Sequence, residues 1–111
     1  MSDEPAPSVA AVFACLADGN RRDVLDVVSR QGRASATTIA RALPISRQGV
    51  AKHLALLAQA GLVTSVREGR EVLYAVRPEP LQAAARWLDQ AADAWDRRLA
   101  ALKAAAEAPD S

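Results

Sequence analysis

A tight turn between two amphipathic segments constrains the fold of this chain more than any other sequence feature. Apolar residues at helical spacing predict one helix over about residues 37–43 and a longer one over about residues 47–60. Pro44 ends the first helix because proline disfavours helical geometry in the residue before it. Ser46 is a favourable N-cap for the second helix. The sequence therefore predicts two helices joined by the four-residue turn Leu43–Ser46.

Two further helices are predicted before this pair. Their apolar residues follow helical spacing, with Val9, Val12, Phe13 and Leu16 on the first and Val24, Leu25, Val27 and Val28 on the second, over about residues 20–31. Either Asp18 or Asn20 could cap the second helix. The segment Arg33–Ala36 is expected to be short and extended, and Ser35 or Thr37 could cap the helix that follows it.

The spacing of apolar residues changes after Gly61. Two β-rich runs, Leu62–Val66 and Glu71–Val76, flank the glycine-containing turn Arg67–Arg70 and predict a β-hairpin. We therefore expect a mainly α chain with a small β-hairpin (α+β) in the order α-α-(short β)-α-α-β-β-α, a winged helix-turn-helix. The expected boundaries are a disordered tail over residues 1–8, the winged domain over 9–78, a C-terminal helix over 79–107 and a second tail over 108–111.

The C-terminal helix carries an apolar stripe with a seven-residue repeat, Leu81, Leu88, Trp95 and Leu102. At 1.5 Å per residue the helix spans roughly 40 Å. A domain this small cannot cover the whole stripe, so a second copy of the chain is the expected partner. The homodimer interface is predicted to comprise Val12, Leu81, Leu88, Trp95, Leu99 and Leu102.

Charge is unevenly distributed along the chain. The formal net charge is only +1, yet the segment from Asn20 to Arg77 holds ten basic and four acidic side chains. A basic middle between acidic ends favours a surface that binds a polyanion. In a helix-turn-helix that polyanion is double-stranded DNA, because the second helix enters the major groove.

The predicted second helix has a polar face suited to this role. When Val50, Leu54 and Leu57 point inward, Arg47 and Gln48 point outward, and these side chains suit guanine and adenine edges. The small residues Gly49 and Ala51 would permit a close approach to a base. The hydroxyl of Ser46 could hold a phosphate, and His53 could either touch phosphate or anchor packing. The predicted DNA-binding residues are Ser46, Arg47, Gln48, Ala51, Lys52 and His53 with Arg67, Gly69 and Arg70 of the hairpin.

These segments resemble a known family. The run SRQGVAKHLALLAQAGLV (46–63) is similar to the recognition-helix signature of the ArsR-type winged-helix repressors, FACLADGNRRDVLDVV (13–28) resembles their opening segment, and REGREVLYAV (67–76) resembles their wing. The resemblance implies a homodimer that binds a palindromic operator of two half-sites and represses transcription, often of its own operon. Many relatives carry serine where this chain has Ala51, which puts a contact from that position in doubt.

Metal sensing is common in that family, but its usual ligands are missing here. The third helix, TTIARAL (37–43), has no cysteine and the last helix has no histidine. Asp89, Asp93 and Asp96 are weak candidates for a hard cation and more often form a solvated helix face. The pattern RWLDQAADAWDRRLAAL (86–102) resembles the family branch without metal sites, so we expect neither metal nor cofactor. A metal-responsive repressor with oxygen ligands and a protein-interaction module stay as alternatives.

Other residues point to a non-enzymatic cytoplasmic protein. The opening MSDEPAPSVAAVF lacks the basic start and apolar run of a signal peptide, and no stretch reaches the roughly 18 apolar residues of a membrane span. We find no nucleophile–base pair or glycine-rich phosphate loop. The lone Cys15 is expected to be a buried thiol, with redox sensing as the alternative. Trp87 and Trp95 are expected in the dimer core, or else above a pocket for a small apolar ligand.

Overall fold

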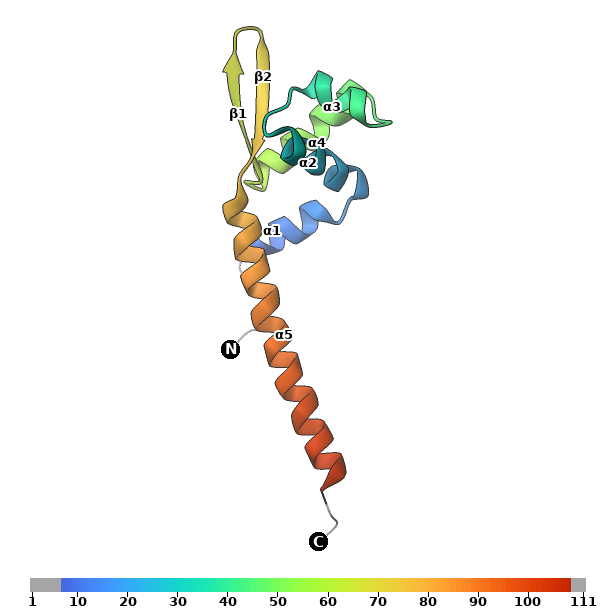
Figure 1. Ribbon diagram of the computed structural model, residues 1–111, viewed down its shortest axis with the longest axis vertical. Helices are drawn as coiled ribbons and strands as arrows, with labels where there is room; N and C mark the ends of the chain where they lie inside the picture. The colour runs from blue at the N-terminus through green and yellow to red at the C-terminus, as the bar shows by residue number, and fades with distance from the viewer. Residues whose placement is uncertain (1–6, 109–111) are drawn as a thin grey trace.

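The computed structural model describes residues 7–108 and has five helices and one two-stranded hairpin (Figure 1). In chain order the elements are α1 (Pro7–Leu16), α2 (Gly19–Gln31), α3 (Ala36–Ala42), α4 (Arg47–Gln59), β1 (Val63–Glu68), β2 (Glu71–Val76) and α5 (Pro78–Glu107). This confirms a mainly helical winged helix-turn-helix with a hairpin and a long C-terminal helix.

One predicted element is wrong. The segment Arg33–Ala36 forms no strand of its own and instead makes a single antiparallel bridge between Ala34 and Tyr74. In that bridge the Ala34 amide donates to the Tyr74 carbonyl at 3.0 Å and the Tyr74 amide donates to the Ala34 carbonyl at 2.8 Å. The segment is too short to pair further because Ser35 already caps α3. One residue pair therefore fastens the start of α3 to the hairpin.

The predicted N-terminal tail is two residues too long. Pro7 and Ser8 belong to the first turn of α1, a position where proline is well tolerated. The rest of that tail, and residues 109–111 of the C-terminal one, lie outside the described residues. Ala108 follows the last residue of α5 as its C-cap.

Short polar side chains begin three of the helices. Asp18, Ser35 and Ser46 are the N-caps of α2, α3 and α4. Each accepts a hydrogen bond from the backbone N–H three residues later, at 3.1, 3.2 and 3.0 Å respectively. Asp18 and Ser35 are thus the caps among the alternatives that the sequence left open. Arg21 and Arg22 also donate to the carbonyls of Cys15 and Leu16, which satisfies the end of α1.

The Asp18 cap makes a testable contribution to acid stability. The N–H of Arg21 first, and the charges of Arg21 and His53 in addition, hold the pKa of Asp18 below its ordinary value of 3.8. A lowered folded-state pKa stabilises the fold above the unfolded value, and that stabilisation disappears as the pH falls through the folded value. We expect Asp18→Asn, which keeps a cap that cannot titrate, to lose less stability below about pH 4 than the natural protein.

Urea midpoints of both proteins between pH 2.5 and 6 would test this expectation. Asp26, whose pKa is lowered mainly by the hydrogen bond from Arg30, titrates in both proteins and serves as a common background. Parallel pH profiles for the two proteins would contradict it.

The core of the winged domain is aliphatic and lies between α1, α2, α3, α4 and the base of the hairpin. Its fully enclosed side chains are Val12, Val24, Val28, Ile39, Val50, Leu54, Leu57 and Leu62. The predicted inward faces of α2 and α4 are therefore confirmed. The Arg77 amide donates to the Leu62 carbonyl at 2.8 Å, which ties the end of the hairpin to its start just before α5 begins.

Only the first part of α5 packs against its own domain. Ala84 is buried, and the Trp87 ring meets Phe13 of α1 edge-on at a centroid distance of 5.6 Å. Beyond this contact the helix projects away from the domain (Figure 1), which gives the molecule extents of 76 × 26 × 19 Å. Among the described residues, no helix is long and apolar enough to cross a membrane.

Candidate nucleic-acid interface

The turn between α3 and α4 presents one face of α4 to solvent. Val50, Leu54 and Leu57 are completely buried, which fixes the rotation of α4 about its axis. Four residues near the start of the helix are exposed: Arg47, Gln48, Ala51 and Lys52. Gln48 and Lys52 lie on the side opposite the buried row. Ser46 caps the helix through its Oγ atom, which accepts a hydrogen bond from the N–H of Gly49 and keeps its own O–H as a donor. The predicted polar face thus exists as a single exposed surface at the start of α4.

Gly49 has a different role from the one its size suggested. A Cβ atom at this position would lie 2.8 Å from Cγ2 of Ile45 and 3.2 Å from Oγ of Ser46. The missing side chain therefore makes room for the turn within the protein, and not for a base. The sequence could not reveal this because it depends on how closely the turn folds back on α4.

Gly49→Ala is expected to destabilise the domain despite the better helix propensity of alanine. The propensity gain is at most about 1 kcal/mol, whereas the overlap with the stiff β-branched Ile45 costs roughly 1–3 kcal/mol. Thermal or urea unfolding would measure the difference. The control is the same substitution made in an Ile45→Ala background, which lacks the clashing methyl group: Gly49→Ala should cost less stability there than in the natural protein. A stabilised single variant would contradict the assignment.

His53 lies apart from the exposed face of α4. It is half-buried, and its Nδ1 atom is enclosed without a hydrogen bond among the described residues. Its charge acts on Asp18 at the start of α2. Both roles that the sequence left open for His53, packing and a contact to phosphate, stay predictions.

The hairpin supplies the other predicted residues. Arg67, Gly69 and Arg70 lie at its tip and are all exposed. Gly69 has a φ of +64°, as the first loop residue of a type II′ turn requires. Glu68 and Glu71 stand opposite each other in the strand register, and Glu68 lies 3.9 Å from Arg33. The tip therefore carries two arginines and two glutamates.

A groove lies between the hairpin and the two helices of the turn. We call it the wing–helix groove and define it by Thr37, Arg47, Ala51, Arg70 and Glu71. Ser35, Ala36, Val72 and Tyr74 complete its walls, and its volume is about 280 Å³. Sequence reasoning named Arg47, Ala51 and Arg70 separately but did not predict that they share one concavity.

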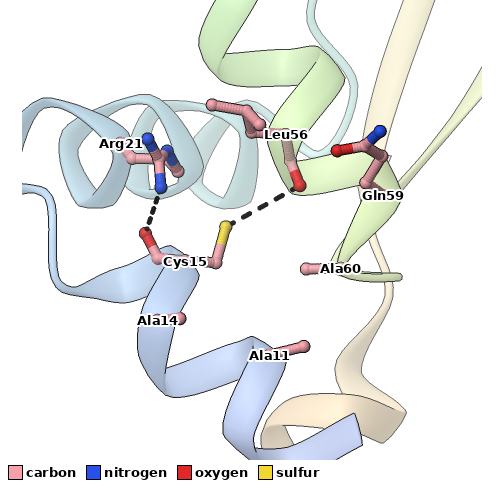
Figure 2. A pocket seen from close by; sticks show the side chains of 7 residues that line it. All are labelled: Ala11, Ala14, Cys15, Arg21, Leu56, Gln59 and Ala60. Carbon is pink, nitrogen blue, oxygen red and sulfur yellow. Dashed lines mark hydrogen bonds between the residues drawn. The ribbon is translucent and has the colours of Figure 1, made fainter.

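A second pocket surrounds Cys15, where α1, α2 and α4 meet (Figure 2). The thiol is buried, at 6% exposure, and its Sγ atom lies 3.8 Å from the Leu56 carbonyl, to which it donates. Arg21 donates to the backbone carbonyl of Cys15 at 3.1 Å, while its Nε atom is enclosed without a hydrogen bond partner in the described part of the chain. The hydrogen bond from its thiol to Leu56 means that Cys15 helps to join α1 to α4.

The weak metal candidates on α5 are exposed. Asp89, Asp93 and Asp96 lie on the part of the helix that projects from the domain. Within residues 7–108, no group of three or more His, Cys, Asp or Glu side chains is placed to hold a metal ion. The absence of a metal stays a prediction.

The α5 stripe is exposed where it was predicted to pack against a partner. Leu88, Trp95, Leu99 and Leu102 are between 51% and 67% exposed, and Arg98 lies over the Trp95 ring at 5.3 Å. Leu81 is half-buried against its own domain. Val12 is only 1% exposed, so it has almost no surface to offer a partner.

The proteins that this chain is similar to include transcriptional regulators. A family model described as a helix-turn-helix domain matches residues 16–66. The chain is 44% identical to an ArsR-like transcriptional regulator from Rhodococcus sp. RHA1, with a TM-score of 0.81 and coverage of 92% of this chain and 95% of that one. The chain belongs to the ArsR family. It is a DNA-binding transcriptional regulator. Its relatives include two proteins that are named as repressors.

Two further proteins are similar over most of this chain. The arsenic resistance transcriptional regulator ArsR1 of Pseudomonas putida is 35% identical over 78 residues, which are 70% of this chain and 58% of that protein. A homodimeric winged helix-turn-helix DNA-binding domain from Mycobacterium bovis is 30% identical, with a TM-score of 0.60 and coverage of 83% and 82%.

Proposed function

We propose that this ArsR-family regulator is a homodimeric repressor that binds a palindromic operator, with α4 of each protomer in the major groove of one half-site. The exposed start of α4 beside an arginine-tipped hairpin is the observation that carries this proposal. The other face of α4 is buried in the core, which fixes the orientation of the helix for base recognition.

Dimerisation through α5 is supported by the exposed apolar stripe. Four large side chains, Leu88, Trp95, Leu99 and Leu102, lie in one row beyond the edge of the domain. A contiguous apolar surface of this kind marks an interaction site. The similar domain from Mycobacterium bovis is homodimeric, and a second copy of this chain offers a matching row. We propose that Leu81 and these four residues form the seam.

The proposed DNA contacts divide between bases and backbone. Gln48 and Lys52 point outward from α4 and suit adenine and guanine edges in the major groove. Ala51 offers only a methyl group, which fits a thymine methyl. The tip of the hairpin would lie against the DNA backbone or the minor groove beside the half-site, through Arg67, Gly69 and Arg70.

We also propose that this regulator belongs to the family branch without a metal site. Its third helix offers no thiolate and its last helix no imidazole, which are the ligands that zinc and nickel favour. Elemental analysis of the purified protein, with and without added zinc or nickel, would test this; stoichiometric metal would contradict it.

A mobility-shift assay tests the proposed function directly. The probes are the DNA upstream of the gene for this protein and a shuffled sequence of the same length and composition. We expect a clear preference for the upstream DNA, and an affinity that falls steeply with salt because phosphate contacts release counterions. Equal binding to both probes at physiological salt would contradict self-regulation, and selection from a random DNA pool would then separate an operator elsewhere from no sequence preference at all.

A further inference from the structure

The wing–helix groove joins the two parts of the molecule that are expected to meet DNA. Thr37 of α3, Arg47 and Ala51 of α4, and Arg70 and Glu71 of the hairpin line it. If α4 occupies the major groove and the hairpin reaches the flanking backbone or minor groove, one DNA strand must pass between them. The backbone of that strand faces the concavity, so its phosphates are the groups that these side chains would meet.

Two guanidinium groups line the groove from different elements. Arg47 is the first residue of α4, and Arg70 lies in the loop of the hairpin. Neither has a hydrogen bond or ion pair within residues 7–108, so both are available to a ligand. A guanidinium presents a planar fork of N–H donors that matches the oxygens of a phosphate. The two side chains can therefore approach one phosphate from two sides.

We propose that the wing–helix groove holds a single backbone phosphate of duplex DNA between Arg47 and Arg70, and that the carboxylate of Glu71 lowers the affinity of the groove for this phosphate. The proposal rests on the proposed function and refines it, because it assigns Arg47 to the backbone and not to a base edge. Gln48 and Lys52 are then left as the base-reading residues of α4.

Thr37 and Glu71 have opposite effects on the affinity of the groove for phosphate. Thr37 is half-buried in its wall and brings a hydroxyl group that can donate to a phosphate oxygen. Glu71 brings a carboxylate, which repels phosphate and offsets one of the two arginine charges. Since phosphate contacts carry no sequence information, Glu71 lowers affinity for every duplex alike. It therefore keeps binding to non-operator DNA weak.

Titrations of Arg47→Ala, Arg70→Ala and Glu71→Gln against two duplexes would test this assignment. Fluorescence anisotropy would give Kd at several salt concentrations for the upstream duplex and for its shuffled counterpart. We expect each arginine variant to weaken binding to both duplexes by the same factor, about 10-fold, and to reduce the salt slope by about one for each protomer. Glu71→Gln should tighten binding to both by a few-fold. Circular dichroism would check that these exposed substitutions leave the fold intact.

Lys52→Ala is the contrasting variant, since Lys52 lies on α4 but not in the groove. It should reduce the preference for the upstream duplex. If Arg47→Ala instead reduces that preference, or leaves the salt slope unchanged, the phosphate assignment is wrong. Failure of the proposed function looks different, because the natural protein would then prefer neither the upstream duplex nor any duplex selected from a random DNA pool.

Neutralising single phosphates would locate the contact on the DNA. In duplexes with one methylphosphonate at each position in turn, the natural protein should lose affinity wherever it contacts a phosphate, and the phosphate in the groove is one such position in each half-site. The double variant Arg47→Ala/Arg70→Ala should be insensitive at that position, while Lys52→Ala keeps the full sensitivity. A double variant that remains as sensitive as the natural protein would overturn the proposal.

Discussion

Replacing Leu88 and Trp95 together by aspartate is expected to leave the winged domain folded and to abolish the dimer. Both side chains are more than half exposed and make no contribution to the core of the protomer. In a dimer each would be removed from water, which contributes about 1.5–3 kcal/mol per large apolar side chain. Four buried carboxylates per dimer would add a desolvation cost. We therefore expect the dimer dissociation constant to rise at least about 100-fold.

Sedimentation equilibrium would measure that change, and circular dichroism would monitor the helix content. The control is Gln90→Asp, which adds one carboxylate per protomer, half the charge of the double variant, on the opposite side of α5. It should remain dimeric. A dimeric Leu88→Asp/Trp95→Asp protein would place the interface elsewhere, and the proposed pairing of α5 helices would then be abandoned. Operator affinity should fall together with dimerisation, because each half-site alone provides only half of the contacts.

Reversing the charge of Lys52 is expected to have the second largest effect. Lys52 is exposed on the face of α4 that is proposed to enter the major groove. Lys52→Glu removes a contact worth about 1–3 kcal/mol to a base edge and introduces repulsion from the DNA phosphates. Since both protomers carry the change, we expect the operator Kd to rise about 100-fold or more. Anisotropy titration at fixed salt would measure it.

The control for this variant is Arg97→Glu. It makes the same change in net charge on an exposed residue of α5, on the side of the helix away from the apolar stripe. We expect it to alter operator affinity by no more than a few-fold. Equal losses in the two variants would show that net charge alone governs binding, and the proposed role of α4 would fail.

The elements with strong local signals could be predicted from the sequence. The helices α2 and α4 combine a clear apolar period with a short polar cap and a following glycine, so their ends were predicted to within about one residue. The hairpin was recognisable because a glycine-containing turn, predicted over Arg67–Arg70, separates two β-rich runs. In the structure β1 extends to Glu68, so the loop has only two residues. In each case the information lies within about fifteen neighbouring residues.

Features that depend on distant contacts could not be predicted in the same way. The single bridge between Ala34 and Tyr74 joins residues forty positions apart, and the local sequence at Arg33–Ala36 therefore suggested a strand that does not exist. The absence of a side chain at Gly49 is explained by the close approach of Ile45, which the local sequence does not show. The wing–helix groove similarly combines three elements that only the tertiary fold brings together.

The projection of α5 beyond its contact with Phe13 makes folding and assembly interdependent. An isolated helix of this remaining length is marginal in water, because most helical stability in proteins comes from packing. We therefore expect the end of α5 to draw its stability from the partner, so that the unfolding temperature rises with protein concentration. A cell that lowers the amount of this regulator would then lose operator occupancy faster than the concentration itself falls.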